Sequence, residues 1–343
     1  MAYSSIVKPS VYFNTKLYTG NGGTNAITGV GFQPDFNWLK NRSNTGEHIL
    51  VDAVRGMYNI RSNSTTAQSA NGSSHQQSLD SDGFTVAGTG ANSNANGNTF
   101  ASWNWKANGA GSANTDGSIT STVSANTTSG FSIVSYTGGG ASATIGHGLG
   151  VAPKVIMIKC TDSTDKWIVY HNSIGNTKYL VLNNTDAQTT DSAHFNNTSP
   201  TNSVFSVGTS GATSGNGQHF IAYCFAEKTG YSKFGSYVGN DVADGTFVYC
   251  GFKPAFVMLK KSSQTSDWLI CDSKRNTSNV VNKKLFPNTN GTEDSYDVSD
   301  FVSNGFKIRT TSGAINASGQ TYIYMAFAEA PLVGTNNVPC TAR

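Results

Sequence analysis

The residues of this chain that could carry chemistry are few and widely spaced. Acidic residues form two dense groups, Asp80-Ser81-Asp82 and Glu293-Asp294 with Asp297 and Asp300. A close pair of carboxylates would suit glycoside hydrolysis, and a carboxylate cluster would suit calcium. Both groups instead precede a Gly-containing turn signal, and neither has the spacing of an EF-hand loop. We interpret them as turn-forming side chains in loops, with calcium binding as the alternative.

Other catalytic and metal-binding patterns are also missing from the sequence. The six histidines occur one at a time, which disfavours a metal cluster. His147 lies in a Gly-rich run, residues 146–150, which we interpret as a turn. No Gly-x-Ser-x-Gly elbow, HExxH helix, Walker loop or dinucleotide fingerprint occurs. We therefore expect no enzyme activity, and no catalytic, cofactor-binding or metal-binding residues.

Charge and cysteine content disfavour several classes of partner. The 23 Lys and Arg oppose 20 Asp and Glu, giving a net charge of +3 with no basic run, so we expect no nucleic-acid partner. No apolar stretch reaches the ~18–20 residues that span a bilayer, and the first residues lack a signal-peptide pattern. We expect no membrane insertion. The five cysteines lack CxxC spacing and are predicted to be mostly buried free thiols.

The elements that carry these residues are predicted to be short strands. Apolar runs of four to eight residues, rich in Val, Ile and aromatic residues, are separated by clusters of Gly, Asn, Ser and Asp. No long helical period appears. The pattern predicts an all-β fold of two-layer antiparallel β-sandwiches of jelly-roll type, with a closed barrel as the alternative.

One pattern of landmark residues occurs three times along the chain. Each copy has a Gly-x-x-Pro phrase, a Lys six residues after the Pro, and an Asp or His eighteen residues after it. Two aromatic landmarks follow in each copy. In chain order, the five landmarks are Pro34, Lys40, Asp52, Phe84 and Trp105; Pro153, Lys159, His171, Phe205 and Phe225; and Pro254, Lys260, Asp272, Phe306 and Phe327.

The repeats predict the domain organisation. The three β-sandwich modules are residues 1–108, 129–229 and 230–331, and a tail of residues 332–343 follows. Residues 109–128 are rich in Gly, Ser, Thr and Asn and are predicted to be a flexible linker. Because a unit of roughly 100 residues can fold by itself, we expect three separate domains in a row.

The recurring lysine is predicted to extend its amine beyond the sheet. Asp52 and Asp272 are candidate carboxylate partners in the first and third copies, whereas Glu227 is the candidate in the second. Because the partner differs between copies, we interpret the lysine as a structural ion pair or a solvated side chain. Ligand binding is the alternative.

The repeat also resembles a known protein family. The strings that carry the resemblance are Tyr12 to Gly22, Gly31 to Lys40, Asp80 to Val86, Tyr223 to Glu227 and Ile323 to Glu329. They resemble a repeat domain of virion structural proteins from marine tailed bacteriophages of the cyanophage type, often labelled tail fibre. The family has no assigned catalytic residues to carry over.

The resemblance implies a location in the virion and other virion proteins as partners. We expect a non-enzymatic structural protein, a tail fibre or tail-associated component that contributes to host-surface attachment. A capsid decoration or head-fibre protein is the alternative, and a tailspike enzyme that degrades polysaccharide is a further one.

The segments that differ most among the copies are predicted to make intermolecular contacts, since loops on a shared scaffold adapt to different neighbours. A homo-oligomer, with a trimer favoured, would add avidity to weak contacts, and a host-surface glycan is a candidate ligand. The predicted contact residues are Tyr179, Leu180, Leu182, Lys283, Lys284 and Phe286.

Overall fold

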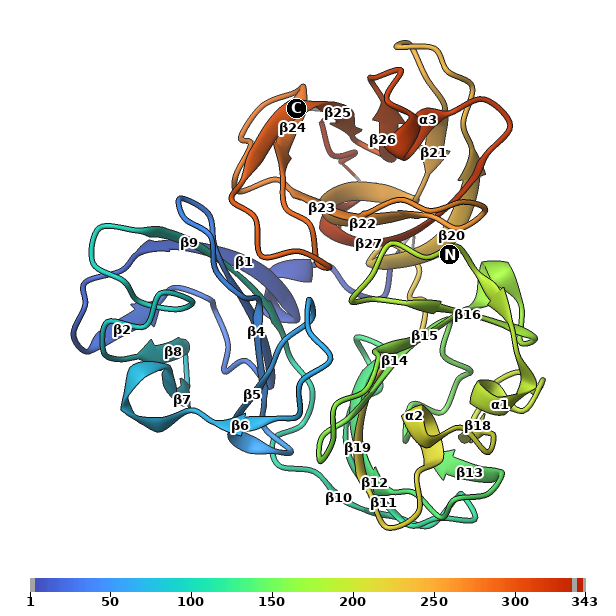
Figure 1. Cartoon of the computed structure of the whole chain (residues 1–343). Coiled ribbons are helices and arrows are strands. Elements are labelled where there is room, and N and C mark those ends of the chain that lie inside the picture. Colours follow the sequence, from blue (N-terminus) through green and yellow to red (C-terminus); the bar gives the residue numbers. More distant parts are fainter. Residues whose placement is uncertain (1–3, 335–337, 342–343) are drawn as a thin grey trace.

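The computed structural model describes residues 4–334 and 338–341, and nearly all of its regular structure is antiparallel β-strand. Three lobes, one for each repeat, surround a common centre (Figure 1). We refer to them as repeats 1, 2 and 3 in chain order. The predicted all-β, sandwich-type fold is confirmed.

Each repeat contributes one inner sheet to the centre of the molecule. In repeat 1 the strand order is β1 (Phe13–Thr19), β9 (Thr99–Trp105), β3 (Phe36–Asn41), β4 (Ile49–Asp52), β5 (Gly56–Ile60) and β6 (Ser69–Ala70). In repeat 2 it is β10 (Ser112–Asn114), β11 (Ser121–Asn126), β12 (Phe131–Thr137), β19 (His219–Phe225), β14 (Val155–Cys160), β15 (Ile168–His171), β16 (Lys178–Val181) and β17 (Thr189–Thr190). In repeat 3 it is β20 (Ser232–Val238), β27 (Thr321–Pro331), β22 (Phe252–Lys261) and β23 (Trp268–Asp272).

An outer sheet completes each lobe; it has fewer strands than the inner sheet in repeats 1 and 2 and the same number, four, in repeat 3. The outer strands are β2 (Asn25–Thr28), β8 (Gly83–Val86) and β7 (Gln76–Asp80) in repeat 1, and β13 (Ala143–Gly146) and β18 (Val204–Val207) in repeat 2. In repeat 3 they are β21 (Phe247–Tyr249), β26 (Gly305–Ile308), β25 (Asp294–Val302) and β24 (Val281–Lys284). The helical turns are η1 (Pro9–Val11), η2 (Gly72–Ser74), η3 (Asn172–Ile174), α1 (Ser192–Phe195), α2 (Gly211–Ser214) and α3 (Gly313–Asn316). None of the described helices is long enough to cross a membrane.

Strand pairing confirms that the three copies share one arrangement. The strand that contains or follows each landmark Pro pairs antiparallel with the strand that contains the last aromatic landmark. Equivalent pairs face each other in all three sheets: Phe36 with Trp105, Val155 with Phe225, and Phe256 with Phe327. The outer sheets match in the same way, pairing Ile27 with Phe84, Ile145 with Phe205, and Val248 with Phe306.

The segment predicted to be a flexible linker is instead part of repeat 2. Residues 109–128 contain β10 and β11, and β11 pairs with β12 along six residues, from Ser121 opposite Tyr136 to Asn126 opposite Phe131. The polar composition misled the prediction, because a strand at the edge of a sheet needs few apolar side chains when the backbone pairing itself is satisfied.

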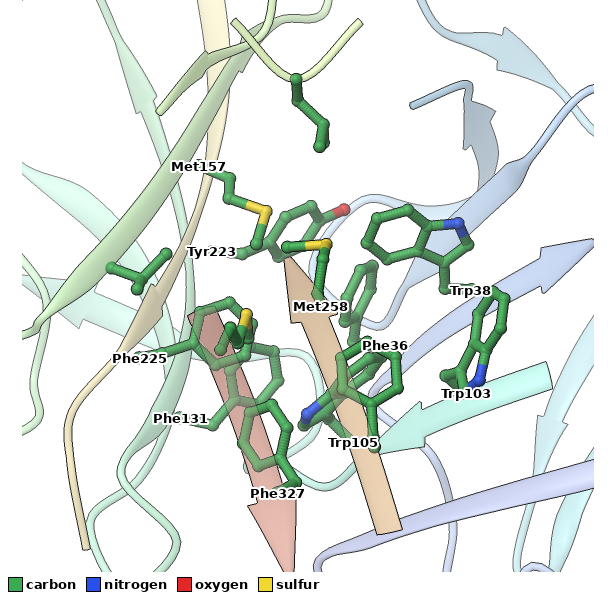
Figure 2. Packing of buried hydrophobic residues seen from close by; sticks show 14 of the residues in the cluster. Phe36, Trp38, Trp103, Trp105, Phe131, Met157, Tyr223, Phe225, Met258 and Phe327 are labelled. Carbon is green, nitrogen blue, oxygen red and sulfur yellow. The ribbon is translucent and has the colours of Figure 1, made fainter. Parts of the chain in front are cut away.

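The three repeats also share one core and are not separate domains. Trp105, Phe225 and Phe327 meet where the inner sheets converge, with ring centroids 6.2 Å apart for Trp105–Phe225, 5.6 Å for Trp105–Phe327 and 5.9 Å for Phe225–Phe327. Figure 2 shows them among other buried side chains from all three repeats. Each inner sheet is therefore covered on both faces, which is why the central strands are apolar at nearly every position.

Candidate functional site

The landmark Asp of repeats 1 and 3 ends a buried strand and holds a buried arginine. Asp52 Oδ2 lies 2.6 Å from Arg55 Nε, and its Oδ1 accepts backbone N–H bonds from Val54 and Arg55. Asp272 repeats this geometry with Arg275, whose Nε lies 2.5 Å from Oδ2. The carboxylate thus fixes the turn and compensates the guanidinium charge in a place without solvent.

Each of these carboxylates also reaches a neighbouring repeat. Tyr223 of repeat 2 donates its hydroxyl to Asp52 Oδ2 at 2.8 Å. Trp103 of repeat 1 donates its indole N–H to Asp272 Oδ2 at 3.0 Å. We call these contacts the Asp52 junction and the Asp272 junction. Both join inner sheets through a charged hydrogen bond, which is stronger than a neutral one.

Repeat 2 forms the third contact, the His171 junction, without a charge. His171 Nε2 lies 3.1 Å from the carbonyl oxygen of Tyr324 in repeat 3, and its Nδ1 accepts a bond from Ser173 N. Ile174 stands where the other repeats have arginine. Burial lowers the pKa of His171 to about 4, so the ring is neutral near pH 7 and donates from Nε2.

The recurring lysines are buried, contrary to the expectation that their amines extend beyond the sheet. Each amine donates to two backbone carbonyls: Lys40 to Asn41 and Asn290, Lys159 to Cys160 and Ser163, and Lys260 to Thr185 and Ser266. The predicted carboxylate partners bind other cations: Asp52 and Asp272 bind arginines, and Glu227 binds Lys233. Burial lowers the pKa of each of the three amines to about 8.

The hairpins that follow the lysines also join neighbouring repeats in a cyclic order. Backbone N–H groups of Gly46, Asp165 and Ser266 donate to carbonyls of Asn290 in repeat 3, Thr65 in repeat 1 and Thr185 in repeat 2, respectively. Two residues further on, Trp167 donates its indole N–H to Arg61 O and Trp268 donates to Val181 O. His48 takes the same place in repeat 1 and contacts Phe286 O through Nε2.

The acidic groups identified in the sequence bind residues of the protein. Asp82 accepts N–H bonds from Gly29 and Gly31, as expected of a turn-forming carboxylate. Glu293 makes two bonds to Arg42, at 2.8 and 2.9 Å, and lies 3.3 Å from Arg275. Burial opposes ionisation of Glu293, but the bonds from Arg42 and the charge of Arg275 outweigh it and lower its pKa.

Two further carboxylates of these groups also contact residues of the protein, although they lie in strands β7 and β25 and not in the predicted loops. Asp80 accepts a bond from the Thr85 hydroxyl, and Asp294 lies 2.6 Å from Lys284 Nζ. Within residues 4–334 and 338–341, no group of three or more His, Cys, Asp and Glu side chains is arranged to hold a metal ion. All five cysteines are free, and all but Cys340 are buried.

The predicted intermolecular contact residues lie mainly inside the chain. Leu180, Leu182 and Lys284 are fully buried, so the prediction is wrong for these three because the chain's own residues already cover them. Tyr179 is half-buried against His194, and Phe286 packs against the core of repeat 3. For Tyr179, Lys283 and Phe286, contact with a second chain stays a prediction. These segments contact their own repeat and also a neighbouring one, since Trp268 donates to Val181 O and His48 contacts Phe286 O.

The residues that bind the landmark Asp carboxylates were not identified from the sequence. Arg55 and Arg275 each follow the landmark Asp by three residues, and this Asp-x-x-Arg spacing was a usable signal. Tyr223 and Trp103 were visible only as members of aromatic runs. Because they bind carboxylates of other repeats, no local pattern could have identified them.

Together, these contacts suit a structural role. Asp52, Asp272, Arg55 and Arg275 have almost no exposed surface, so no dissolved substrate meets them. Asp52 and Asp272 join neighbouring repeats through the bonds from Tyr223 and Trp103. Each carboxylate also orders its own turn by binding the arginine three residues later. The arrangement holds backbone segments in place.

The family comparison agrees with the extent of this architecture. A family described as a domain of unknown function, DUF7483, has a profile that matches residues 8–331, which include all three repeats. The chain belongs to this family. Neither a curated protein nor a solved structure gives a match. The DUF7483 domain therefore corresponds to the complete three-lobed body and not to one repeat.

Proposed function

We propose that this DUF7483 chain is a non-enzymatic structural protein of a bacteriophage virion, where it serves as a tail fibre or tail-associated component in host-surface attachment. The observation that carries the proposal is that the motifs resembling phage virion proteins build the shared core. Phe225 and Phe327 lie within two of the resembling strings, and their rings meet where the inner sheets converge, with centroids 5.9 Å apart. The resembling strings thus supply residues of the core that all three repeats share.

The polar landmarks support a structural role in the same way. Asp52, His171 and Asp272 are polar residues at equivalent positions, and each one makes a hydrogen bond to a neighbouring repeat in addition to the bonds within its own turn. A protein on the outside of a particle must keep its shape without disulfides when it folds in a reducing cytoplasm. A core shared by three sheets supplies that stability through buried apolar area.

The capsid-decoration alternative is favoured by one feature of the surface. Phe247 and Tyr249, on the outer sheet of repeat 3, are 45% and 57% exposed. Exposed aromatic side chains on neighbouring positions suit a fixed place against another protein. A host-surface glycan remains a proposed ligand, and homo-oligomerisation remains part of the proposal, although one chain already places three repeats around a centre.

Immunogold labelling of intact phage particles with antibodies against the purified chain tests the proposal. Label on the tail is the expected result. Label on the capsid would support the decoration alternative, and particles without label would overturn a virion role.

Incubation of the purified chain with host-surface polysaccharide should release no reducing ends. Release of reducing ends would favour the tailspike-enzyme alternative.

A further inference from the structure

The three inner sheets differ at one edge. In repeat 2 the edge beyond β12 is covered by β11, whereas β1 in repeat 1 and β20 in repeat 3 end their sheets. No strand within the described part of the chain pairs with the outer side of β1 or β20. Open edges offer unpaired backbone donors and acceptors, and natural proteins cover or guard them.

The backbone groups that face the open edge of β20 can be identified from the pairing. Gly239 N donates to Gln320 O. Because backbone groups alternate in direction along a strand, the N–H and C=O groups of Tyr237 and Gly235 point towards β27, and those of Phe234 and Ser236 point away from it. Their counterparts in β12, Ile133 and Ser135, face Ser124 and Thr122 of β11. The outward groups of β20 thus have the geometry that accepts a strand in repeat 2.

The surface beside β20 is hollowed, and exposed apolar side chains lie next to it. A hollow of about 330 Å³ lies beside this strand and is lined in part by Ser232, Lys233 and Tyr249. Four of the eight exposed large hydrophobic residues among those described lie within residues 238–249. They are Val238, Val242, Phe247 and Tyr249, at 53%, 50%, 45% and 57% exposure. Such clustering marks an interaction surface.

A segment that followed the path of residues 112–126, which cover β12 in repeat 2, would not fit beside β20 in repeat 3. Tyr249 is the counterpart of Gly146, and Asn114 lies so close to Gly146 that a Cβ atom there would be 1.6 Å from Asn114 Oδ1. A tyrosine at this place would collide with a segment that ran as residues 112–126 do. A strand that pairs with β20 must therefore follow a different path.

Charge distinguishes the two open edges. Tyr18 and Tyr237 are equivalent, since each packs edge-on against the Phe landmark of its outer sheet, Phe84 or Phe306. Counting back two residues places Lys16 at the centre of β1 and Gly235 at the centre of β20. If two copies paired through β1 about a twofold axis centred there, Lys16 would face Lys16, which is unfavourable. At β20, glycine would face glycine.

We propose that two copies of this chain associate through β20, edge to edge, about a twofold axis at Gly235. The two strands run antiparallel, and the outward groups of Phe234 in one copy bond to those of Ser236 in the other. Lys233 is paired with Glu227 at 2.7 Å within its own chain, so no uncompensated charge enters the contact. The dimer covers the apolar side chains beside β20 and leaves β1 free, and it does not depend on the proposed virion role.

Sedimentation velocity of the full chain at 1–50 µM tests the association. The wild type should sediment as a dimer of the 36.2 kDa chain. Ser236→Pro removes an outward N–H while sparing the bonds to β27, and should sediment as a monomer. Ser236→Ala, which keeps the N–H, is the matched control and should stay dimeric. A monomeric or trimeric wild type, or a dimer that persists in Ser236→Pro, would overturn the proposal.

Hydrogen exchange of the wild-type dimer gives a second measurement that needs no variant. The amides of Phe234 and Ser236 should exchange at least tenfold more slowly at 50 µM than after dilution to a monomeric concentration. The equivalent amides of Thr15 and Leu17 in β1 are the internal control and should exchange alike at both concentrations. Equal protection of the two edges, or protection of β1 alone, would contradict the choice of β20.

Discussion

The Asp52 and Asp272 junctions and the His171 junction occupy the same place in three related repeats, yet they join neighbouring sheets by different chemistry. The first two use a buried carboxylate that binds an arginine of its own turn and a donor from another repeat. The third uses a neutral imidazole that donates to Tyr324 O. The position of Asp52, His171 and Asp272 therefore requires a hydrogen bond to a neighbouring repeat but does not require a charged side chain.

The difference has consequences for stability. A buried ion pair contributes little compared with an apolar pair of the same size, but losing one partner leaves an uncompensated charge. A buried neutral histidine has no such weakness at neutral pH, and becomes costly when acid favours the protonated ring. The two kinds of junction should therefore fail under different conditions, and the three predictions that follow test this contrast.

The largest effect is expected at the Asp52 junction. Asp52→Ala leaves Arg55 buried without its carboxylate and should cost about 3–5 kcal/mol of unfolding free energy in urea titrations. Asp272→Ala should cost less, because Glu293 Oε2 remains 3.3 Å from Arg275 Nη1. Replacement of the exposed Asp297 by Ala is the control. Equal losses at both junctions would show that Glu293 does not compensate.

The His171 junction should weaken in acid. Its folded-state pKa of about 4 lies below the usual value of 6.5, so the unfolded chain binds the proton more readily between these values. Stability should therefore fall as the pH drops from 6.5 towards 4, by up to about 3 kcal/mol from this residue. His171→Gln keeps a donor and should remove that part of the slope. Parallel profiles for variant and wild type would refute the assignment.

A smaller effect on the free energy of unfolding is expected from the recurring lysines, which make similar contacts in all three repeats. The folded-state pKa of Lys159, about 8, lies below the usual 10.5, so stability should rise with pH between these values. Guanidinium unfolding at pH 7.5 and 9.5 should show a gain about 2 kcal/mol smaller in Lys159→Met than in the wild type. The exposed Lys166, replaced by Met, serves as the control. A variant that gains as much as the wild type would argue against a charged, buried amine.

Strands and repeats could be predicted from the sequence because both depend on the types and spacing of residues that are close together in the chain. Val155 to Cys160 is apolar almost throughout and lies between turn signals, so its strand state follows from residue type. The constant distance from each Pro to its Lys and to its Asp or His reflects one hairpin, β3–β4 or its equivalents, built three times. Because covalent geometry fixes the rise per residue along a strand, equivalent hairpins keep the same number of residues between their landmarks, and this constant spacing is visible in the sequence.

Tertiary structure alone decided which residues meet. Ser121 to Asn126 has the composition of a linker, and it becomes a strand because β12 offers an open edge. Lys159 resembles a surface lysine in sequence, and it is buried because carbonyls of its own hairpin accept its amine. Trp105, Phe225 and Phe327 stand more than 100 residues apart in the chain, and they touch because three sheets bury their inner faces together. Such contacts depend on long-range packing, which leaves no periodic trace along the chain.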